Sequence, residues 1–325
     1  MTIKDAVNAG ISEYEAHRLA FESARSLDEA LKIAWGYSDD NCFYQHYTTL
    51  DSVLTKISKG QWWMTRSVAE SLNDLQEVKK FGSQRVARKT YQASFIRGVD
   101  ESTAMWGLYC RDNPFAVRIL MPAKAFSEWQ WCIKKEYGDA VNCVDFRDII
   151  YASVPYIQKD RDAYDKARGN SITWRDANCN FRRGKIEQDA LARKLLDPRL
   201  TGWIKDREWR HERETRLCVR FVKSCQKDAI PVSIPVSVIN QMSFTASPWL
   251  STEHEKIVKR MLECALDLNW KRLRTQDCKA KRKVGWFHRS VLAGALNFKK
   301  EIGAKCPNPK RCVFSVMTAK GVRDR

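Results

Sequence analysis

Two glutamates and an arginine stand at alternate positions late in the chain. They are Glu212, Glu214 and Arg216. Alternate residues of an extended strand point to the same face, so this spacing predicts two carboxylates and a guanidinium side by side. A guanidinium keeps neighbouring carboxylates ionised, and an ionised carboxylate can stabilise developing positive charge or accept a proton from an attacking group. The alternative is the solvated face of an edge strand, where ion pairs contribute little.

Three further short blocks of polar and aromatic residues precede this one. His46 lies in an aromatic segment that predicts a strand, and Trp106 and Tyr109 are about one turn apart in a segment that predicts a helix. Each block also has an ordinary explanation, as a core histidine, a turn or a pair of core aromatics. The four blocks are His46-Tyr47-Thr48, Leu72-Asn73-Asp74 with Glu77, Met105-Trp106 with Tyr109, and Lys205 with Trp209, Glu212, Glu214 and Arg216.

In this order and spacing, the blocks resemble a widespread bacterial family of uncharacterised domains over roughly residues 42–222. That family resembles the ADP-ribosyltransferase fold, through the opening histidine strand, the helix and short strand after it, and the late glutamate strand. The resemblance implies an α+β fold with an ADP-ribosyltransferase-like core of two small packed sheets and flanking helices. It also implies that NAD, as the ADP-ribose donor, binds in a cleft between the sheets.

The resemblance extends to toxins that ADP-ribosylate nucleic acid, including an RNA-modifying toxin of phage-defence modules. It implies an NAD-dependent ADP-ribosyltransferase toxin whose acceptor is single-stranded nucleic acid, RNA (mRNA) in preference to DNA, and it allows a protein antitoxin as a partner. The Glu-x-Glu pair resembles a motif whose second glutamate is catalytic, which favours Glu214 over Glu212. The implied cofactor-binding residues are His46, Tyr47, Thr48, Asn73, Trp106, Tyr109 and Arg216. Tyr47, Tyr91 and Tyr109 are alternative candidates for the residue that stacks on the nicotinamide ring.

The elements that position these residues follow from hydrophobic periodicity and turn residues. Helices are predicted at 49–60, 102–110, 155–200 and 252–274, the third interrupted near 168–174. Strands are predicted at 43–47, 61–65, 91–96, 115–121, 148–151, 216–222 and 230–235. Strands and helices without regular alternation indicate the α+β class. We divide the chain into an N-terminal helical segment at 1–40, a catalytic domain at 41–248 and a basic, mainly helical region at 249–325.

Positive charge is concentrated near the C-terminus. The formal net charge is +18, and residues 251–325 hold 19 Lys/Arg against 7 Asp/Glu, a net of +12. Basic groups with aromatics between them suit single-stranded nucleic acid, because charge follows the phosphates and rings stack on bases. The predicted contacts are Arg272, Arg274, Lys281, Arg282, Lys283 and Trp286. A non-catalytic nucleic-acid-binding module, or a helical subdomain with a core of these aromatics, would show the same composition.

Several other classes of protein are disfavoured. No apolar stretch approaches the length of a membrane span and no secretory signal is visible, so we expect a cytoplasmic protein without a membrane partner. The 11 cysteines include no CxxC, which favours reduced thiols. Cys278, His288, Cys306 and Cys312 are spaced too widely for a usual zinc site, so no metal is expected. A metal-dependent nuclease stays open, with ligands drawn from Asp74, Glu77, Glu212 and Glu214.

Overall fold

The structure is a computed structural model that describes most of the chain between residues 42 and 273. The described ranges are 42–68, 83–110, 113–152, 171–175, 181–185, 197–224, 227–273 and 286–293, with residue 77 and a few positions between 24 and 31. Two units interleave along the sequence. The first comprises Met1–Asn41, Trp63–Arg97 and Phe126–Val232, and the second comprises Cys42–Trp62, Gly98–Ala125 and Ser233–Arg325. The boundaries predicted after residues 40 and 248 stay predictions.

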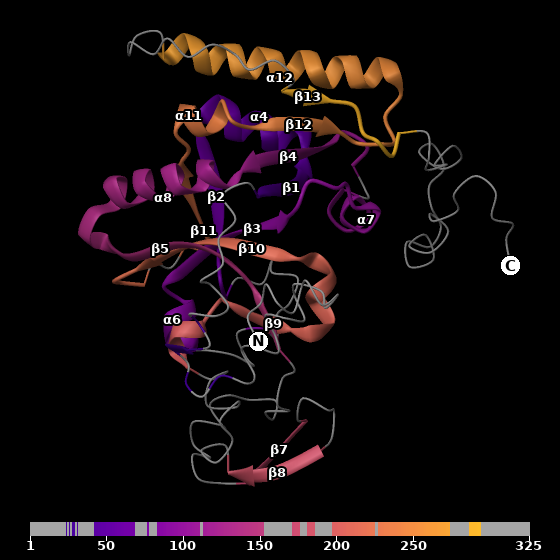
Figure 1. The fold of residues 1–325 in the computed structure, drawn as a ribbon. Helices are drawn as coiled ribbons and strands as arrows, with labels where there is room; N and C mark the ends of the chain where they lie inside the picture. The colour runs from indigo at the N-terminus through magenta and orange to yellow at the C-terminus, as the bar shows by residue number, and fades with distance from the viewer. Residues whose placement is uncertain are drawn as a thin grey trace, which may run out of the picture. The chain divides into compact units, whose positions relative to one another are not determined.

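The strands of the first unit form a mostly antiparallel array in the order β11–β2–β3–β10–β5 (Figure 1). Their bounds are Gln61–Arg66 for β2, Thr90–Arg97 for β3, Val141–Asp148 for β5, Glu214–Phe221 for β10 and Ala229–Ser233 for β11. In the β3–β10 register, Arg216 lies opposite Ser94 and Glu214 lies opposite Ile96. Because directly opposed residues share a face of a sheet, Ser94 and Arg216 point the same way, together with Glu214 two residues earlier.

A helix of the first unit, α8 (Ala123–Tyr137), packs against this array through aromatic side chains. Phe126 stacks on Phe146 of β5 with ring centroids 3.8 Å apart, and it meets Phe95 of β3 edge to face at 4.8 Å. Trp129 and Ile133, further along the same face of the helix, are also fully buried. Burial of these large apolar groups supplies the main driving force for holding β3 and β5 under the helix.

The remaining elements of the first unit are short. Two strands, β6 (Ile150–Ala152) and β9 (Ile204–Asp206), pair in parallel, and the 3-10 helix η4 (Arg207–Glu212) leads from β9 to β10. A small cluster of Ile149, Tyr151, Trp203 and Cys218, with Trp209 packed against it, fixes these pieces. The others are α6 (Gln84–Ala87), η1 (Gly138–Ala140), η3 (Pro198–Leu200), β7 (Ser171–Arg175) and β8 (Phe181–Lys185).

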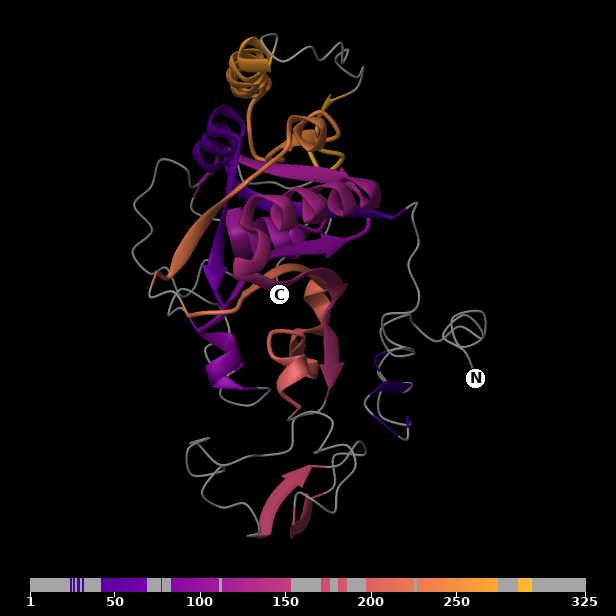
Figure 2. The same cartoon turned by 90° about the vertical axis from the view of Figure 1, so that its left-hand side faces the viewer.

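The second unit contains the strand order β1–β4–β12–β13, in which only the last pair is parallel. The strands are β1 (Phe43–Thr49), β4 (Ala116–Pro122), β12 (Ser243–Ala246) and β13 (Phe287–His288). The helices are α4 (Leu50–Lys59), α7 (Thr103–Cys110), α11 (Val236–Ile239) and α12 (Thr252–Leu273). Thr49 caps α4 by accepting from the Ser52 amide, and Gly60 ends it in the left-handed conformation. Figure 2 shows α12 beside α4, which it contacts.

The predicted α+β class is confirmed, as are the strands near 43, 61, 91, 116, 214 and 229 and the helices at α4, α7 and α12. The predicted helical stretch 155–200 is wrong at β8, which pairs antiparallel with β7, whereas β7 lies mostly within the interruption predicted near 168–174. Most of the N-terminal segment and of the basic region lies outside the described residues. In the part of the chain that is described, no helix is long and apolar enough to cross a membrane.

Candidate functional site

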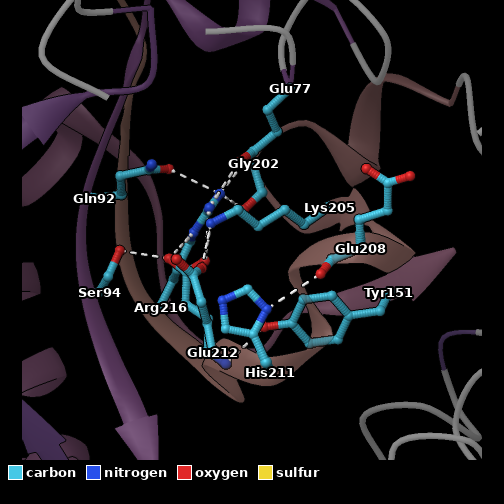
Figure 3. Close-up of polar contacts among 11 residues, drawn as sticks. Glu77, Gln92, Ser94, Tyr151, Gly202, Lys205, Glu208, His211, Glu212 and Arg216 are labelled. Carbon is cyan, nitrogen blue, oxygen red and sulfur yellow. Dashed lines mark hydrogen bonds and ion pairs between the residues drawn. The ribbon is translucent and has the colours of Figure 1, made fainter. Parts of the chain in front are cut away.

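A group of five charged side chains is buried in the first unit (Figure 3). We call it the charged cluster, and it consists of Glu77, Lys205, Glu212, Glu214 and Arg216. Each of the five residues is at most 5% exposed. Charged groups are rarely buried unless they are paired, because removal from water disfavours the charged form strongly. The contacts within the cluster therefore decide what it can do.

Arg216 is the centre of the cluster. Its Nε donates to Glu214 Oε1 at 2.6 Å, and its NH2 group donates to Glu214 Oε2 at 3.0 Å. On its other side it forms a second two-point contact with Glu77, including NH2 to Oε2 at 2.8 Å. The NH1 group also donates to the Gly202 carbonyl oxygen at 2.9 Å. All five N–H groups of the guanidinium thus have partners inside the protein.

This saturation of the Arg216 guanidinium bears on one prediction. The sequence resemblance implies that Arg216 contacts the cofactor, and this stays a prediction. In the structure it is almost completely buried and donates only to protein oxygens. Its geometry instead suits the positioning of Glu214, because a two-point contact fixes both the place and the orientation of a carboxylate.

The two glutamates of the Glu-x-Glu pair lie on different elements. Glu212 is the last residue of η4, and Glu214 is the first residue of β10. Arg213 between them has φ of 46°, the left-handed conformation that non-glycine residues rarely adopt. The expectation that both glutamates share one face of a strand is therefore wrong for Glu212 and right for Glu214 and Arg216.

Lys205 of β9 nevertheless brings the two carboxylates together. Its Nζ donates to Glu212 Oε2 at 2.5 Å and to Glu214 Oε2 at 3.2 Å. The Trp209 ring lies beside the ammonium, with Nζ 4.7 Å from the ring centroid. Burial lowers the pKa of Lys205, but the charges of Glu214 and Glu212 outweigh it, so the net shift is upward and the ammonium stays charged.

Glu214 accepts four hydrogen bonds. Oε1 receives Ser94 Oγ at 2.5 Å and Arg216 Nε, and Oε2 receives Arg216 NH2 and Lys205 Nζ. Burial raises the pKa of Glu214, but the Arg216 and Lys205 charges and these hydrogen bonds lower it to about 2. The amide of Glu214 donates to the hydroxyl of Tyr151 at 2.7 Å. Ser94 itself is exposed, so the cluster borders the surface on this side.

The charges of the cluster do not balance. Three carboxylates face two cations, which leaves one net negative charge when all three acids are ionised. Burial raises the pKa of Glu77, and the Arg216 charge opposes that shift only in part. An excess of negative charge held in place, away from water, stabilises positive charge that develops beside it. This is the chemistry that the arrangement supports best.

In the second unit, the His46-Tyr47-Thr48 block is divided between two faces of β1. Gln45 and Tyr47 are buried on one face, whereas His46 and Thr48 are half-buried on the other. The His46 ring lies 4.7 Å from the ring of Trp62, on the side of α4. The three residues therefore do not form one continuous contact surface, as alternation along a strand requires.

The aromatic pair on α7 is also divided. Trp106 is fully buried, packs edge to face on Tyr47 at 4.8 Å, and donates from Nε1 to Glu101 Oε2 at 3.1 Å. Tyr109 is 39% exposed. These positions favour the core explanation for Trp106 and leave Tyr109 as the accessible ring.

Arg118 of β4 is a buried cation that the sequence did not point to. It is 7% exposed and donates to Gln45 Oε1, the Val99 carbonyl and Thr245 Oγ1 at 2.8–3.1 Å. The described residues offer it no carboxylate partner, and its Nε–H has no acceptor there. The hydroxyl of Tyr47 donates to the same Gln45 oxygen and accepts from the Ser102 amide, so this group fixes the segment before α7.

The remaining predicted site residues are mostly outside the described part of the chain. Asn73, Arg274, Lys281, Arg282 and Lys283 lie there, and the side chain of Arg272 does too. Trp286 is described; it is half-buried, and the centroid of its ring lies 6.1 Å from the centroid of the Phe244 ring. Within the residues described, no group of three or more His, Cys, Asp or Glu side chains is placed to hold a metal ion.

Comparisons with known proteins give one weak likeness. No family model and no curated protein matches the chain. The chain is similar to solved structures of DarT from Thermus sp. 2.9. For the complex with NAD+, the identity is 13%, the match covers 78% of this chain and 100% of that chain, and the TM-score is 0.28. For the complex with ADP-ribosylated ssDNA, the corresponding values are 13%, 71%, 91% and 0.28. TM-scores this low do not establish a common fold.

Proposed function

We propose that this protein is an NAD-dependent ADP-ribosyltransferase with nucleic acid as its acceptor. The observation that carries the proposal is the charged cluster, where three buried carboxylates face two cations and Glu214 is held ionised. The four sequence blocks support the same chemistry. The likeness to DarT, with TM-scores of 0.28 and 0.29, carries no weight here.

The reaction breaks the bond between ribose C1′ and the nicotinamide nitrogen, and the bonding electrons leave with nicotinamide. Positive charge then develops on the ribose, as in glycoside cleavage, and Glu214 stabilises it. A nucleophilic atom of the nucleic acid forms the new bond to C1′ and gives up its proton. Glu212, which is held by Lys205 next to Glu214, is the proposed acceptor of that proton.

The surrounding residues hold Glu214 in place rather than react. Arg216, Lys205 and Ser94 keep its carboxylate ionised and oriented. Ser94 is exposed, and we propose that a ribose hydroxyl approaches Glu214 from its side. His46, Tyr47, Thr48, Asn73 and Tyr109 remain the proposed contacts of NAD. Tyr109 is 39% exposed, whereas Tyr47 is buried.

The proposal includes RNA as the preferred acceptor, the role of a toxin in phage defence and an antitoxin as partner. All three rest on the sequence resemblance alone. The experiment is intact-mass analysis of RNA, single-stranded DNA of the same sequence, and protein after exposure to NAD. An added ADP-ribose on one class identifies both the chemistry and the acceptor.

Two variants test the assignment of the carboxylates. Glu214→Gln should lower both nicotinamide release in water and transfer to nucleic acid by about a hundredfold or more, because the charge that stabilises the ribose is lost. Glu212→Gln should lower transfer more than release into water. Glu253→Gln, an exposed glutamate on α12, is the matched control. Labelling by both site variants at the parental rate would contradict the proposal, and strand cleavage without NAD would indicate a nuclease.

A further inference from the structure

One of the two tryptophans on α8 is turned away from the core. Trp131 on α8 is 62% exposed, whereas Trp129 on the same helix is fully buried. Residues two positions apart on a helix point about 200° apart, so the two rings lie on opposite sides of it. The buried side holds Phe126, Trp129 and Ile133. Trp131 is therefore not needed for the packing of α8, and it is the most exposed aromatic residue among those described.

Positive charge accompanies this ring. Lys135, one turn later on α8, places its Nζ 5.1 Å from the centroid of the Trp131 ring. Lys134 is its exposed neighbour. A cation over one face restrains the orientation of the indole and leaves the rest of the ring accessible. The glutamates at 128 and 136 reduce the net charge of the helix, so stacking is expected to contribute more than charge.

We propose that Trp131, with Lys134 and Lys135, forms a stacking platform for a base of single-stranded nucleic acid. The choice of nucleic acid rests on the proposed function. An exposed aromatic ring beside lysines matches the two features that single strands offer, which are the face of an unpaired base and the neighbouring phosphate. This platform adds to the basic C-terminal region a second surface that the sequence analysis did not identify.

The test is direct binding of a labelled single-stranded RNA, and of DNA of the same sequence, to the full chain without NAD. Trp131→Ala should weaken binding by about fivefold to about a hundredfold, the range that loss of one base–aromatic stack produces. Trp131→Phe should keep most of the affinity. Lys135→Gln should lower the slope of log affinity against log salt by about one.

Trp63→Ala is the matched control. Trp63 of β2 belongs to the same unit and is 51% exposed, but the described residues place no cation over its ring. Equal losses in the two alanine variants, or parental affinity of Trp131→Ala, would overturn the proposal. Glu214→Gln should lose transfer but bind the strand as the parent does. Because transfer and binding are measured separately, a failure of the catalytic proposal can be told apart from a failure of the stacking platform. A parent that releases nicotinamide but binds no strand would overturn the platform alone.

Discussion

Glu214→Gln should remove a contribution to the free energy of unfolding that is present at neutral pH and is lost as the pH falls. The folded protein holds the pKa of this carboxyl at about 2 against an ordinary value of 4.5, because burial, which raises it, is outweighed by the Arg216 and Lys205 charges. A carboxyl with a depressed pKa stabilises the fold above its unfolded pKa and loses that contribution as pH falls through the folded one. The two values correspond to about 3 kcal/mol at neutral pH, lost between about pH 4.5 and about pH 2.

Glu77 acts in the opposite direction. Burial raises the pKa of Glu77, and the charge of Arg216 opposes that shift only in part. The ionised form of Glu77 therefore lowers the free energy of unfolding, and protonation of Glu77 removes this cost. The acid sensitivity of the parent is therefore a difference between these opposing effects. Comparison of the parent with Glu214→Gln isolates the contribution of Glu214, provided that the exposed-site variant Glu253→Gln behaves as the parent.

Urea unfolding of the three proteins over a series of pH values measures this contribution. At neutral pH, Glu214→Gln should be less stable by about 3 kcal/mol, because the ionised carboxylate that Arg216 and Lys205 stabilise is lost and each cation keeps only its other partner, Glu77 or Glu212. The difference in free energy of unfolding should shrink by about 3 kcal/mol as pH falls from about 4.5 towards about 2. A difference that stays constant over this window would refute the depressed pKa and, with it, the stabilisation of the Glu214 carboxylate by Arg216 and Lys205.

Four further substitutions test the stability of the two units and the role of Lys205. Gly202→Ala should destabilise the fold by about 1–3 kcal/mol in urea unfolding, because Gly202 has φ of 81° and its carbonyl accepts from Arg216; Gly107→Ala, in a helix with nothing within 4 Å of the added carbon, should instead stabilise it by about 1 kcal/mol. Tyr47→Phe should cost about 1–3 kcal/mol of unfolding free energy, since it leaves the partly buried Ser102 amide without its acceptor and removes the buried hydrogen bond to Gln45. Lys205→Met should abolish ADP-ribosyl transfer in the mass assay while NAD binding, followed by calorimetry, persists.

Sequence periodicity predicted the strands β1, β2, β3, β4, β10 and β11 but missed the helix α8, and the two tryptophans of α8 explain why. Trp129 faces the core and Trp131 faces solvent, so large apolar residues occur on both sides of the helix. The one-sided apolar pattern that identifies an amphipathic helix is therefore blurred. Trp131, whose exposed ring obscures the apolar pattern of α8, is also the residue that we propose binds a base.

For the charged cluster, local spacing could predict only what lies on one strand. Glu214 and Arg216 share a face of β10 as their spacing requires, and the same alternation could have shown that His46 and Tyr47 point to opposite faces of β1. Ser94 joins the cluster only through the register of β3 against β10, and a single sequence does not specify such long-range pairing. Glu212 lies off the strand because Arg213 adopts the left-handed conformation, and an arginine at this position gives no sequence signal for such a turn.

The contacts of Glu214 explain why it, rather than Glu212, is suited to stabilise charge. Electrostatic stabilisation is most effective when the stabilising group is already oriented and does not move during the reaction. Arg216 and Lys205 fix Glu214 from within the protein, and Ser94 fixes it from the exposed side. Glu212 lies at the end of a 3-10 helix, next to a strained residue, and Lys205 joins it to Glu214. When Glu212 takes up the proton, the shared ammonium of Lys205 keeps Glu214 as its ionised partner.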